Sequence, residues 1–509
     1  MMLPPADRAR ALEDDMLAQM RAACQPGGPG GNVAKPSGGG GGGGGKNGGA
    51  AAPPPHASIL MLPTWVTKLP TGDEQGACFA VDVGGTNFRV AYIRLGGARG
   101  EVEAAEMEQL AIPRHVYTGT QEQLFDFLAR PLARMVRRMQ ASGAVPTGPG
   151  AARPAVGFCW SFPLEQTALD AGRLMCWTKG FDVPGVVGHD PVRLLAAALE
   201  RAGAPCRVRC VLNDSVAVLA AGCYFDRHCE MGVILGTGTN ACVALPTEDV
   251  PKWRPPPPGR PASRGGARSL SPSPSPSPAP APAAASPHAG KTALNTEWGC
   301  YGSGLLPFAP EDLELDAASG PQKGTMLVEK MMSGLWLGEV ARRVLLTFAE
   351  RAALFGHGAL PAALCQPGAF TTAHMSAVES DRSLSLSETD RVLSEALGTP
   401  RGTLPYEALR TAQLLCRLVV RRSARMAARL LAATLRQQRW AERPRPITVA
   451  VDGGVVLKYA NWRRYLDEYL AEALGGRRMA RLVHLRATPD GSSFGAAVLA
   501  AAAASEDAA

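Results

Sequence analysis

Acidic and amide side chains stand at the ends of apolar stretches of this chain, and these residue types could carry chemistry. Asn213 and Asp214 follow the strand-like segment 208–212, Glu297 lies in the segment Asn-Thr-Glu-Trp-Gly, and Glu329 lies in Val-Glu-Lys. Carboxylates and amides bind vicinal hydroxyl groups, and a carboxylate can also take a proton from one. Each residue alone also fits a plain structural reading, which is a helix N-cap for Asp214 and a solvated charge for the two glutamates.

A second polar group lies between these residues and the start of the chain. Ser161 lies near the end of the strand-like segment 156–162, and Thr178 and Lys179 lie between the aromatic residues Trp177 and Phe181. Hydroxyl and ammonium groups in apolar surroundings can donate hydrogen bonds to a polyhydroxylated ligand.

Two Gly/Thr turns, about 150 residues apart, each separate two strand-like segments. They are 82–87 (Asp-Val-Gly-Gly-Thr-Asn) and 236–240 (Gly-Thr-Gly-Thr-Asn). Glycine lets the backbone approach an anion, and turn N–H groups and threonine hydroxyls donate to phosphate oxygens. Asp82 could hold Mg²⁺ through water, because this cation prefers oxygen ligands. The pair of turns therefore suggests a nucleotide bound between two duplicated lobes.

The second turn, with Ala241 after it, also fits a dinucleotide-binding fingerprint. That fold needs a helix next, to bring its N-terminus to the pyrophosphate. Here the strand-like segment 241–245 and then Pro246 follow, so an oxidoreductase is disfavoured. The segment from Gly40 to Lys46 nearly matches a P-loop, but Asn47 replaces the required Ser or Thr.

Composition excludes several classes of protein. The chain has 509 residues and a formal net charge of +8. The two Gly/Pro-rich segments, 26–55 and 254–290, contain six basic residues and no acidic one, so the remainder is close to neutral. This disfavours a nucleic-acid or membrane surface. No apolar run is long enough to span a bilayer.

The chain start and the cysteines bear on the compartment. Residues 1–20 contain four acidic residues and no apolar stretch, which disfavours a signal or transit peptide. The twelve cysteines lack a CxxC pair, so we expect reduced core thiols and no metal cluster. We therefore expect a cytoplasmic protein, and a monomer.

Hydrophobic periodicity predicts alternating helices and strands. The helices are expected at 9–23, 123–140, 191–203, 215–224, 326–354, 406–437, 461–474 and the Ala-rich C-terminus, and the strands at 79–95 (a hairpin), 156–162, 208–213, 231–235, 241–245, 447–451 and 481–486. In 406–437, one apolar face is marked by Leu409, Cys416, Val420, Ala427, Leu431 and Leu435, and Arg421, Arg425 and Arg429 are expected on a solvated face.

Long motifs of the chain resemble the eukaryotic hexokinase family, in order, and single-unit plant or algal hexokinases in particular. They are FAVDVGGTNFRV, VGFCWSFPLEQTALDAGRLMCWTKGF, VLNDS, GVILGTGTNAC, NTEWG, EKMMSGLWLGEVARRVL, VAVDGG and DGSSFGAA, and they cover most of 58–500. The resemblance implies an α/β, two-lobed, actin-like and ribonuclease-H-like ATPase fold, with sugar and MgATP bound in the cleft between the lobes. It implies an ATP-dependent hexokinase acting on the 6-hydroxyl of glucose and other hexoses.

The resemblance also implies roles for individual residues. Asp214 would be the general base, and Lys179 would help to orient the reacting hydroxyl. The implied sugar contacts are Ser161, Thr178, Lys179, Asn213, Asp214, Asn240, Glu297 and Glu329. The implied ATP and Mg²⁺ residues are Asp82, Gly84, Gly85, Thr86, Asn87, Arg89, Thr237, Gly238, Gly453, Gly454, Gly491 and Ser492, with Mg²⁺ at Asp82 through water.

The sequence departs from the family pattern at four positions, three of which the resemblance places near one cleft. Val218 stands where the family has a threonine, and Gly454 where it has a serine or threonine. Met326 stands at a glutamine position and Trp160 at a phenylalanine position. Each lost neutral hydrogen bond costs on the order of 1 kcal/mol. These losses leave open an alternative, a glucose sensor that binds sugar and turns over poorly.

The domain organisation follows from the motifs and the low-complexity segments. We expect an N-terminal helix with a disordered linker at 1–57, an N-terminal lobe at 58–224 and a C-terminal lobe at 225–505. The insert 254–290 is expected to be disordered, to split a hairpin and to be dispensable for catalysis. Lys252, Pro255 and Pro258 fit, weakly, a ligand of a polyproline-II-binding domain.

Overall fold

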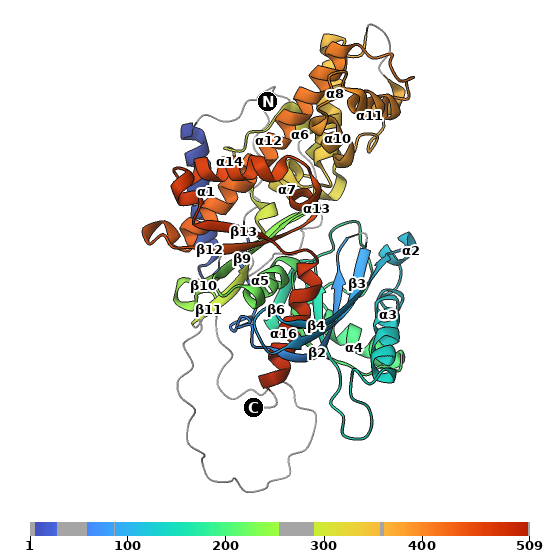
Figure 1. Cartoon of the computed structure of the whole chain (residues 1–509), viewed down its shortest axis with the longest axis vertical. Helices are drawn as coiled ribbons and strands as arrows, with labels where there is room; N and C mark the ends of the chain where they lie inside the picture. The colour runs from blue at the N-terminus through green and yellow to red at the C-terminus, as the bar shows by residue number, and fades with distance from the viewer. Residues whose placement is uncertain (1–5, 28–58, 86, 254–289, 357–360, 507–509) are drawn as a thin grey trace, which may run out of the picture.

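The computed structural model describes residues 6–27, 59–85, 87–253, 290–356 and 361–506, and its core is built on two separate sheets (Figure 1). The linker and nearly all of the insert lie outside the described residues, as does Thr86, so their predictions stay predictions. In the described part, the two sheets have five and six strands.

The five-stranded sheet has the strand order β4-β3-β2-β5-β8. Its strands are β2 (Gln75–Val83), β3 (Asn87–Gly96), β4 (Val102–Ala111), β5 (Ala155–Trp160) and β8 (Arg207–Leu212). Strands β2 and β3 form the predicted hairpin, and β2, β5 and β8 run parallel. Alternating residues of β2 face opposite sides. Phe79 and Val81 pack with α3 (Gln121–Ala141) and α4 (Pro191–Arg201), and Cys78 and Ala80 pack with α5 (Asp214–Phe225) and α16 (Gly491–Glu506).

The six-stranded sheet has the order β1-β11-β10-β9-β12-β13. Its strands are β1 (Leu62–Pro63), β9 (Cys229–Leu235), β10 (Thr239–Pro246), β11 (Lys291–Asn295), β12 (Ile447–Asp452) and β13 (Val483–Ala487). Strand β10 follows the turn 236–238 directly and pairs antiparallel with β9 and β11, so no helix follows that turn. The insert therefore interrupts the β10–β11 hairpin, as predicted, and the Thr247 N–H donates to the Gly290 carbonyl at the base of this interruption.

Helix α5 lies between the two sheets. Every residue from Ser215 to Tyr224 is buried, because the helix packs against β5 on one side and against β9, β10 and β12 on the other. A helix that is apolar all round must be buried in this way. Its N-cap is Asn213, whose side chain accepts from the Ser215 N–H, so the N-cap alternative considered for Asp214 is wrong.

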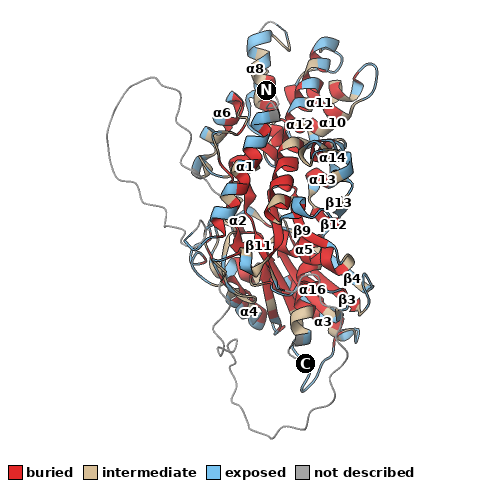
Figure 2. Cartoon of the chain, turned by 90° about the vertical axis from the view of Figure 1, so that its left-hand side faces the viewer, coloured by how far each residue is buried: buried red, intermediate tan, exposed pale blue. Residues whose placement is uncertain are grey.

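Helix α12 (Tyr406–Gln437) matches its predicted bounds and is the longest described helix. Its predicted apolar face is buried, but the face expected to be solvated is not exposed: Arg429 is 7% exposed, and Arg421 and Arg425 are half-buried. The reason is helix α1 (Ala6–Ala23), which packs against α12 with acidic residues of its own. Figure 2 shows α12 mostly in red, the colour of buried residues.

The helical pattern of 326–354 is broken into α7 (Leu327–Met332) and α8 (Leu337–Ala352). Between them the Gly334 N–H donates to the Gly236 carbonyl and the Leu335 N–H to the Thr237 carbonyl, at 2.7 and 3.1 Å. A side chain at 334 would lie 2.9 Å from that Gly236 oxygen. The periodicity could not show this break, because its partner is a turn about 100 residues away.

The remaining elements complete the two lobes. They are β6 (Leu164–Ala168), β7 (Ala171–Leu174), α2 (Arg114–Tyr117), α6 (Pro310–Ala318), α9 (Ala362–Cys365), α10 (Thr372–Ser380), α11 (Ser387–Leu397), α13 (Gly454–Lys458), α14 (Trp462–Ala473) and α15 (Arg477–Ala480). The cysteines form no disulfide among the described residues, and most are buried.

Two segments, β1 and α16, pack on a different sheet from the rest of the lobe in which the sequence places them. The C-terminal helix α16, red in Figure 1, packs on the five-stranded sheet, although the rest of the predicted 225–505 lobe is built on the other sheet. Strand β1 pairs with β11 of the six-stranded sheet. Small residues allow the α16 contacts, because an added Cβ at Gly495 would lie 1.7 Å from the Ala217 carbonyl oxygen.

We predict that Gly495→Ala destabilises the protein, because α16 must move away from α5 to make room for the methyl group. The free energy of unfolding is expected to fall by roughly 2–3 kcal/mol in chemical denaturation. The matched control is Gly304→Ala, where nothing lies within 4 Å of the new Cβ. Equal stability of the two variants would contradict the prediction.

Candidate active site

Asp214 lies at the point where β8 ends and α5 begins. Its Oδ1 atom accepts from the Ser215 N–H at 2.8 Å. Burial raises the pKa of Asp214, and the nearby Lys179 ammonium opposes that rise. A carboxylate that is hard to keep charged has an increased tendency to take a proton, as a general base requires.

Lys179 is held over the end of β5. Its Nζ atom donates to the Ser161 carbonyl at 2.8 Å and lies 5.6 Å from the centroid of the Phe162 ring. Its φ of 57° is in the left-handed region, which is uncommon for a residue with a side chain. Trp177 precedes this turn and Phe181 follows it. Their rings stack on each other with centroids 5.5 Å apart, which helps to fix the turn.

Asn240 connects the polar groups of the large sheet. Its Oδ1 atom accepts from the N–H groups of Ala241 (2.8 Å) and Glu297 (3.0 Å), which fixes the orientation of the amide. Its Nδ2 atom therefore points at Asn213, Asn295 and Glu297, with oxygens at 3.1, 2.8 and 3.2 Å. This one amide joins the β8–α5 junction to the segment that carries Glu297.

The two glutamates are not solvated charges. Glu297 is 8% exposed, and its Oε1 atom also accepts from Asn295 Nδ2 at 2.7 Å. Glu329, on α7, accepts from the Thr239 N–H at 3.1 Å. Burial raises the pKa of both carboxyls, that of Glu329 to about 7. Asp214 contributes to both rises by charge repulsion, so the three carboxyls lie in one site.

Asp82, at the end of β2, meets the start of α16. Its Oδ2 atom accepts from Ser492 Oγ at 2.6 Å, from Ser493 Oγ at 3.0 Å and from Arg89 at 3.3 Å. Arg89 also pairs with Asp490 at 3.5 Å. The first glycine turn and residues 490–493 therefore form one cluster.

The second glycine turn meets the turn that follows β12. Gly453 has a φ of 116°, and an added Cβ there would lie 2.6 Å from the Gly236 nitrogen, so only glycine fits. Asp452 accepts from the N–H groups of Gly453 (2.7 Å) and Gly491 (3.1 Å), and burial raises its pKa to about 6. Around Gly454, by contrast, nothing lies within 4 Å of an added Cβ.

The structure places the remaining predicted residues as follows. In the first turn, the Gly84 N–H donates to the Asn87 carbonyl and Tyr117 donates to the Gly85 carbonyl. The Thr178 carbonyl closes the turn at Phe181, and Gly238 packs against Glu329. Thr237 accepts from Leu335, and Thr86 lies outside the described residues.

Sequence reasoning missed four residues that hold this site together. They are Asn295, Thr239, Asp452 and Ser493. All four lie inside or next to motifs already singled out, so their position was a usable signal. Their partners, however, lie far away in the chain, and local patterns do not show them.

The departures from the family pattern are accommodated differently. Val218 is fully buried, and its methyl group packs beneath Gly491. Met326 caps α7 with a φ of 51°, and its sulfur lies 3.2 Å from Cys300 Sγ. Trp160 is buried in an aromatic cluster with Phe162 and Trp177.

Comparison with known proteins identifies the family. The family models described as hexokinase match residues 47–224 and 230–502. The hexokinase-4, chloroplastic, of Oryza sativa subsp. japonica is 38% identical over 87% of this chain and 80% of its own length. The hexokinase-1 of Nicotiana tabacum is 37% identical over 87% and 83%.

A solved structure agrees with these relatives. The hexokinase from Schistosoma mansoni complexed with glucose superposes with a TM-score of 0.75 at 28% identity, over 98% of this chain and 96% of that one. The expected two-lobed α/β fold is therefore confirmed. Among the described residues, no helix is long and apolar enough to cross a membrane. The chain belongs to the hexokinase family and is a hexose kinase.

Proposed function

We propose that this hexokinase transfers the γ-phosphoryl group of ATP to the 6-hydroxyl of glucose and of related hexoses, with Asp214 as the general base. One observation carries the proposal. Asp214 lies between the two sheets, within electrostatic reach of Lys179, Glu297 and Glu329, and its pKa is raised by burial. This is a site for a polyhydroxylated substrate with one hydroxyl to be deprotonated.

In the proposed reaction, Asp214 takes the proton of the sugar hydroxyl as its oxygen attacks the γ-phosphorus. The bond between that phosphorus and the bridging oxygen breaks, and ADP leaves. Phosphoryl transfer depends mainly on positioning and on charge stabilisation, and the base adds about 10²–10⁴-fold. Lys179, held by the Ser161 carbonyl, would orient the reacting oxygen.

The sugar would be held from both lobes. Ser161, Thr178 and Lys179 come from the side of the small sheet, and Asn240, Glu297 and Glu329 from the side of the large one. A ligand that contacts both sets draws the lobes together, and closure excludes water from the γ-phosphate. This arrangement would suppress hydrolysis of ATP in the absence of sugar.

The phosphates would lie along the glycine turns. The close approach of Gly453 to Gly236 brings the two turns together, and the space around Gly454 leaves room beside them. Mg²⁺ would neutralise charge on the phosphates when bound. Asp82 would bind this ion through a water molecule. Two serine hydroxyls already donate to its Oδ2 atom, so that oxygen is not open to direct coordination.

The alternative of a glucose sensor is not favoured. The family models and the relatives named above are hexokinases, and Asp214, Lys179, Glu297 and Glu329 are all present and gathered in one site. The prediction of a partner with a polyproline-II-binding domain also loses support. The Lys252 ammonium donates to the Leu60 carbonyl at 2.7 Å, and Pro255 and Pro258 lie outside the described residues.

We expect Asp214→Ala to lower kcat for glucose phosphorylation by more than about 100-fold, because the base is lost. Glucose should still change the tryptophan fluorescence, since Trp177 and Trp298 lie at the site. The exposed Asp73→Ala serves as control. A variant that retains more than a tenth of wild-type turnover would contradict the role of Asp214.

Gly454→Ser is expected to lower KM for ATP about 3- to 5-fold, because the added hydroxyl can donate to a phosphate and the site has room for it. KM for glucose should not change. Gly304→Ser is the matched control, since its Cβ is equally free of neighbours. An unchanged or higher KM for ATP would show that position 454 does not contact the nucleotide.

Glu329→Gln is expected to remove a pH-dependent loss of stability. The ordinary glutamate pKa is near 4.5 and burial raises that of Glu329 to about 7. Between these values the unfolded chain loses the proton and the folded protein keeps it, so rising pH favours unfolding. Relative to Glu329→Gln, the wild type should lose about 3 kcal/mol between pH 4.5 and 7, and only a few tenths of a kcal/mol more above pH 7.

Denaturant unfolding at several pH values measures this difference. The exposed Glu122→Gln should show no such divergence from the wild type. Parallel pH curves for the wild type and Glu329→Gln would contradict the assignment.

A further inference from the structure

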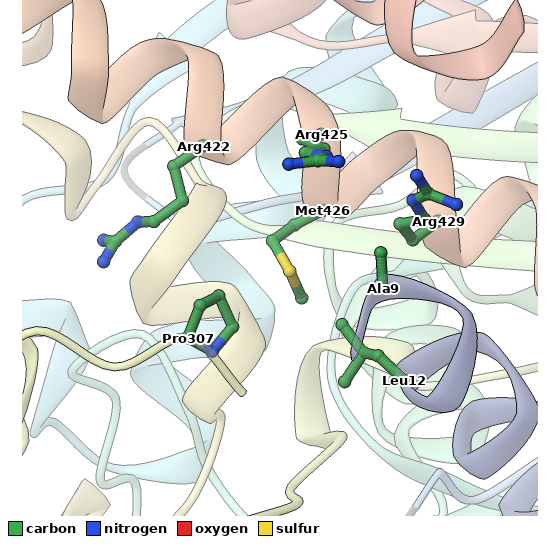
Figure 3. Close-up of a pocket in the computed structure, with 7 residues that line it drawn as sticks. All are labelled: Ala9, Leu12, Pro307, Arg422, Arg425, Met426 and Arg429. Carbon is green, nitrogen blue, oxygen red and sulfur yellow. The ribbon is translucent and has the colours of Figure 1, made fainter. Parts of the chain in front are cut away.

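Helix α1 is packed tightly on the large lobe. Leu12, Met16 and Met20 on one face are each at most 1% exposed. Figure 3 shows Ala9 and Leu12 turned toward Met426 and Arg429 of α12. The gap between them has a volume of only about 10 Å³, which is about the space of one water molecule.

Charge pairs complete the contact between α1 and α12. Glu13 is fully buried and pairs with Arg429 and Arg436, and Asp14 pairs with Arg436 at 2.7 Å. Arg429 also pairs with Glu472 of α14 at 2.5 Å. These pairs hold the helix in one position along α12.

A separate set of contacts joins α1 to the segment after Glu297. The Tyr301 hydroxyl donates to Asp15 Oδ2 at 2.5 Å, and Gln19 Nε2 donates to the Gly302 carbonyl at 3.1 Å. Gln19 also donates to Asp15 Oδ2, at 3.2 Å. Tyr301 is fully buried, and burial together with Asp15 raises its pKa, so the hydroxyl keeps the proton that it donates.

Tyr301 is connected to Glu297 by one short helical turn. The Cys300 N–H donates to the Glu297 carbonyl and the Tyr301 N–H to the Trp298 carbonyl, both at 3.0 Å. Glu297 itself has a φ of 50°, in the left-handed region that a residue with a side chain occupies only when its neighbours hold it. A shift of Tyr301 would therefore be passed directly to the Glu297 backbone.

We propose that Asp15 is a positioning residue for the sugar site: through its bond to the Tyr301 hydroxyl, helix α1 holds the 297–302 segment so that the Glu297 carboxylate faces the substrate. The inference rests on the proposed role of Glu297 as a sugar ligand. It assigns a function in substrate binding to the N-terminal helix, which is separated from Glu297 by more than 270 residues of sequence.

Four variants of the full chain test this inference. Asp15→Ala and Tyr301→Phe should each raise KM for glucose roughly 3- to 10-fold and leave KM for ATP unchanged, because only the sugar side is displaced. The Asp15→Ala/Tyr301→Phe double variant should be no worse than either single variant, because both break the same bond. Asp15→Asn keeps an acceptor oxygen and should restore most of the wild-type KM.

Asp14→Ala is the matched control. Asp14 lies on α1 beside Asp15, and its loss breaks the ion pair with Arg436 of α12 but leaves Tyr301 untouched. Tyr301→Phe keeps the buried ring, so it tests the bond even if an α1 variant unfolds. Glucose titrations followed by tryptophan fluorescence should show the same order of affinities without turnover. Additive effects of Asp15→Ala and Tyr301→Phe, or an Asp15→Ala effect no larger than that of Asp14→Ala, would overturn the inference.

Glu297→Gln, measured in parallel, separates this inference from the proposed function. If Glu297→Gln leaves KM for glucose unchanged, the assignment of Glu297 as a sugar ligand is wrong. If it raises that KM and the Asp15 and Tyr301 variants do not, only the positioning role of α1 fails.

Discussion

Three carboxyl groups are withdrawn from water around a single ammonium group in this protein, and much of the surrounding structure serves to hold them there. Asp214, Glu297 and Glu329 repel one another, and burial raises the pKa of each, so the charged site is costly to assemble. Lys179 offsets part of the repulsion. Amide and backbone donors offset more, above all Asn240 and Asn295. The Asn240 amide can serve this way because two backbone N–H groups fix its orientation.

The fold fixes them with close backbone contacts at the ends of strands. Helix α5 fills the space between the two sheets, and glycines at 453 and 495 bring neighbouring backbones nearer than any side chain would allow. Such contacts leave little freedom for the turns that carry the functional groups. The left-handed residues Lys179, Glu297 and Met326 all border the site, which is where strained backbone is commonly concentrated.

Local patterns were sufficient for much of this architecture. The periodicity of 406–437 predicted α12. The β-branched and aromatic residues on either side of the Gly84-Gly85 turn predicted the β2–β3 hairpin. The motifs also singled out Asp214, Lys179, Glu297 and Glu329, which lie together in the structure. What could not be predicted depends on partners distant in sequence: the burial of Arg429 requires the acids of α1, and the break after α7 requires the Gly236 carbonyl. The residues of 421–429 and 326–354 do not by themselves indicate either partner.

The position of α16 has a consequence for the order of events during biosynthesis. Ribosomes release the strands of the five-stranded sheet early, but the helix that covers one of its faces consists of residues 491–506. Cys78, Ala80 and Ala91 on that face stay without their final cover until residues 491–506 have emerged. The first lobe therefore cannot finish folding by itself as it leaves the ribosome. A frameshift upstream of residue 491 would therefore remove the cover of a sheet built from residues 75–212.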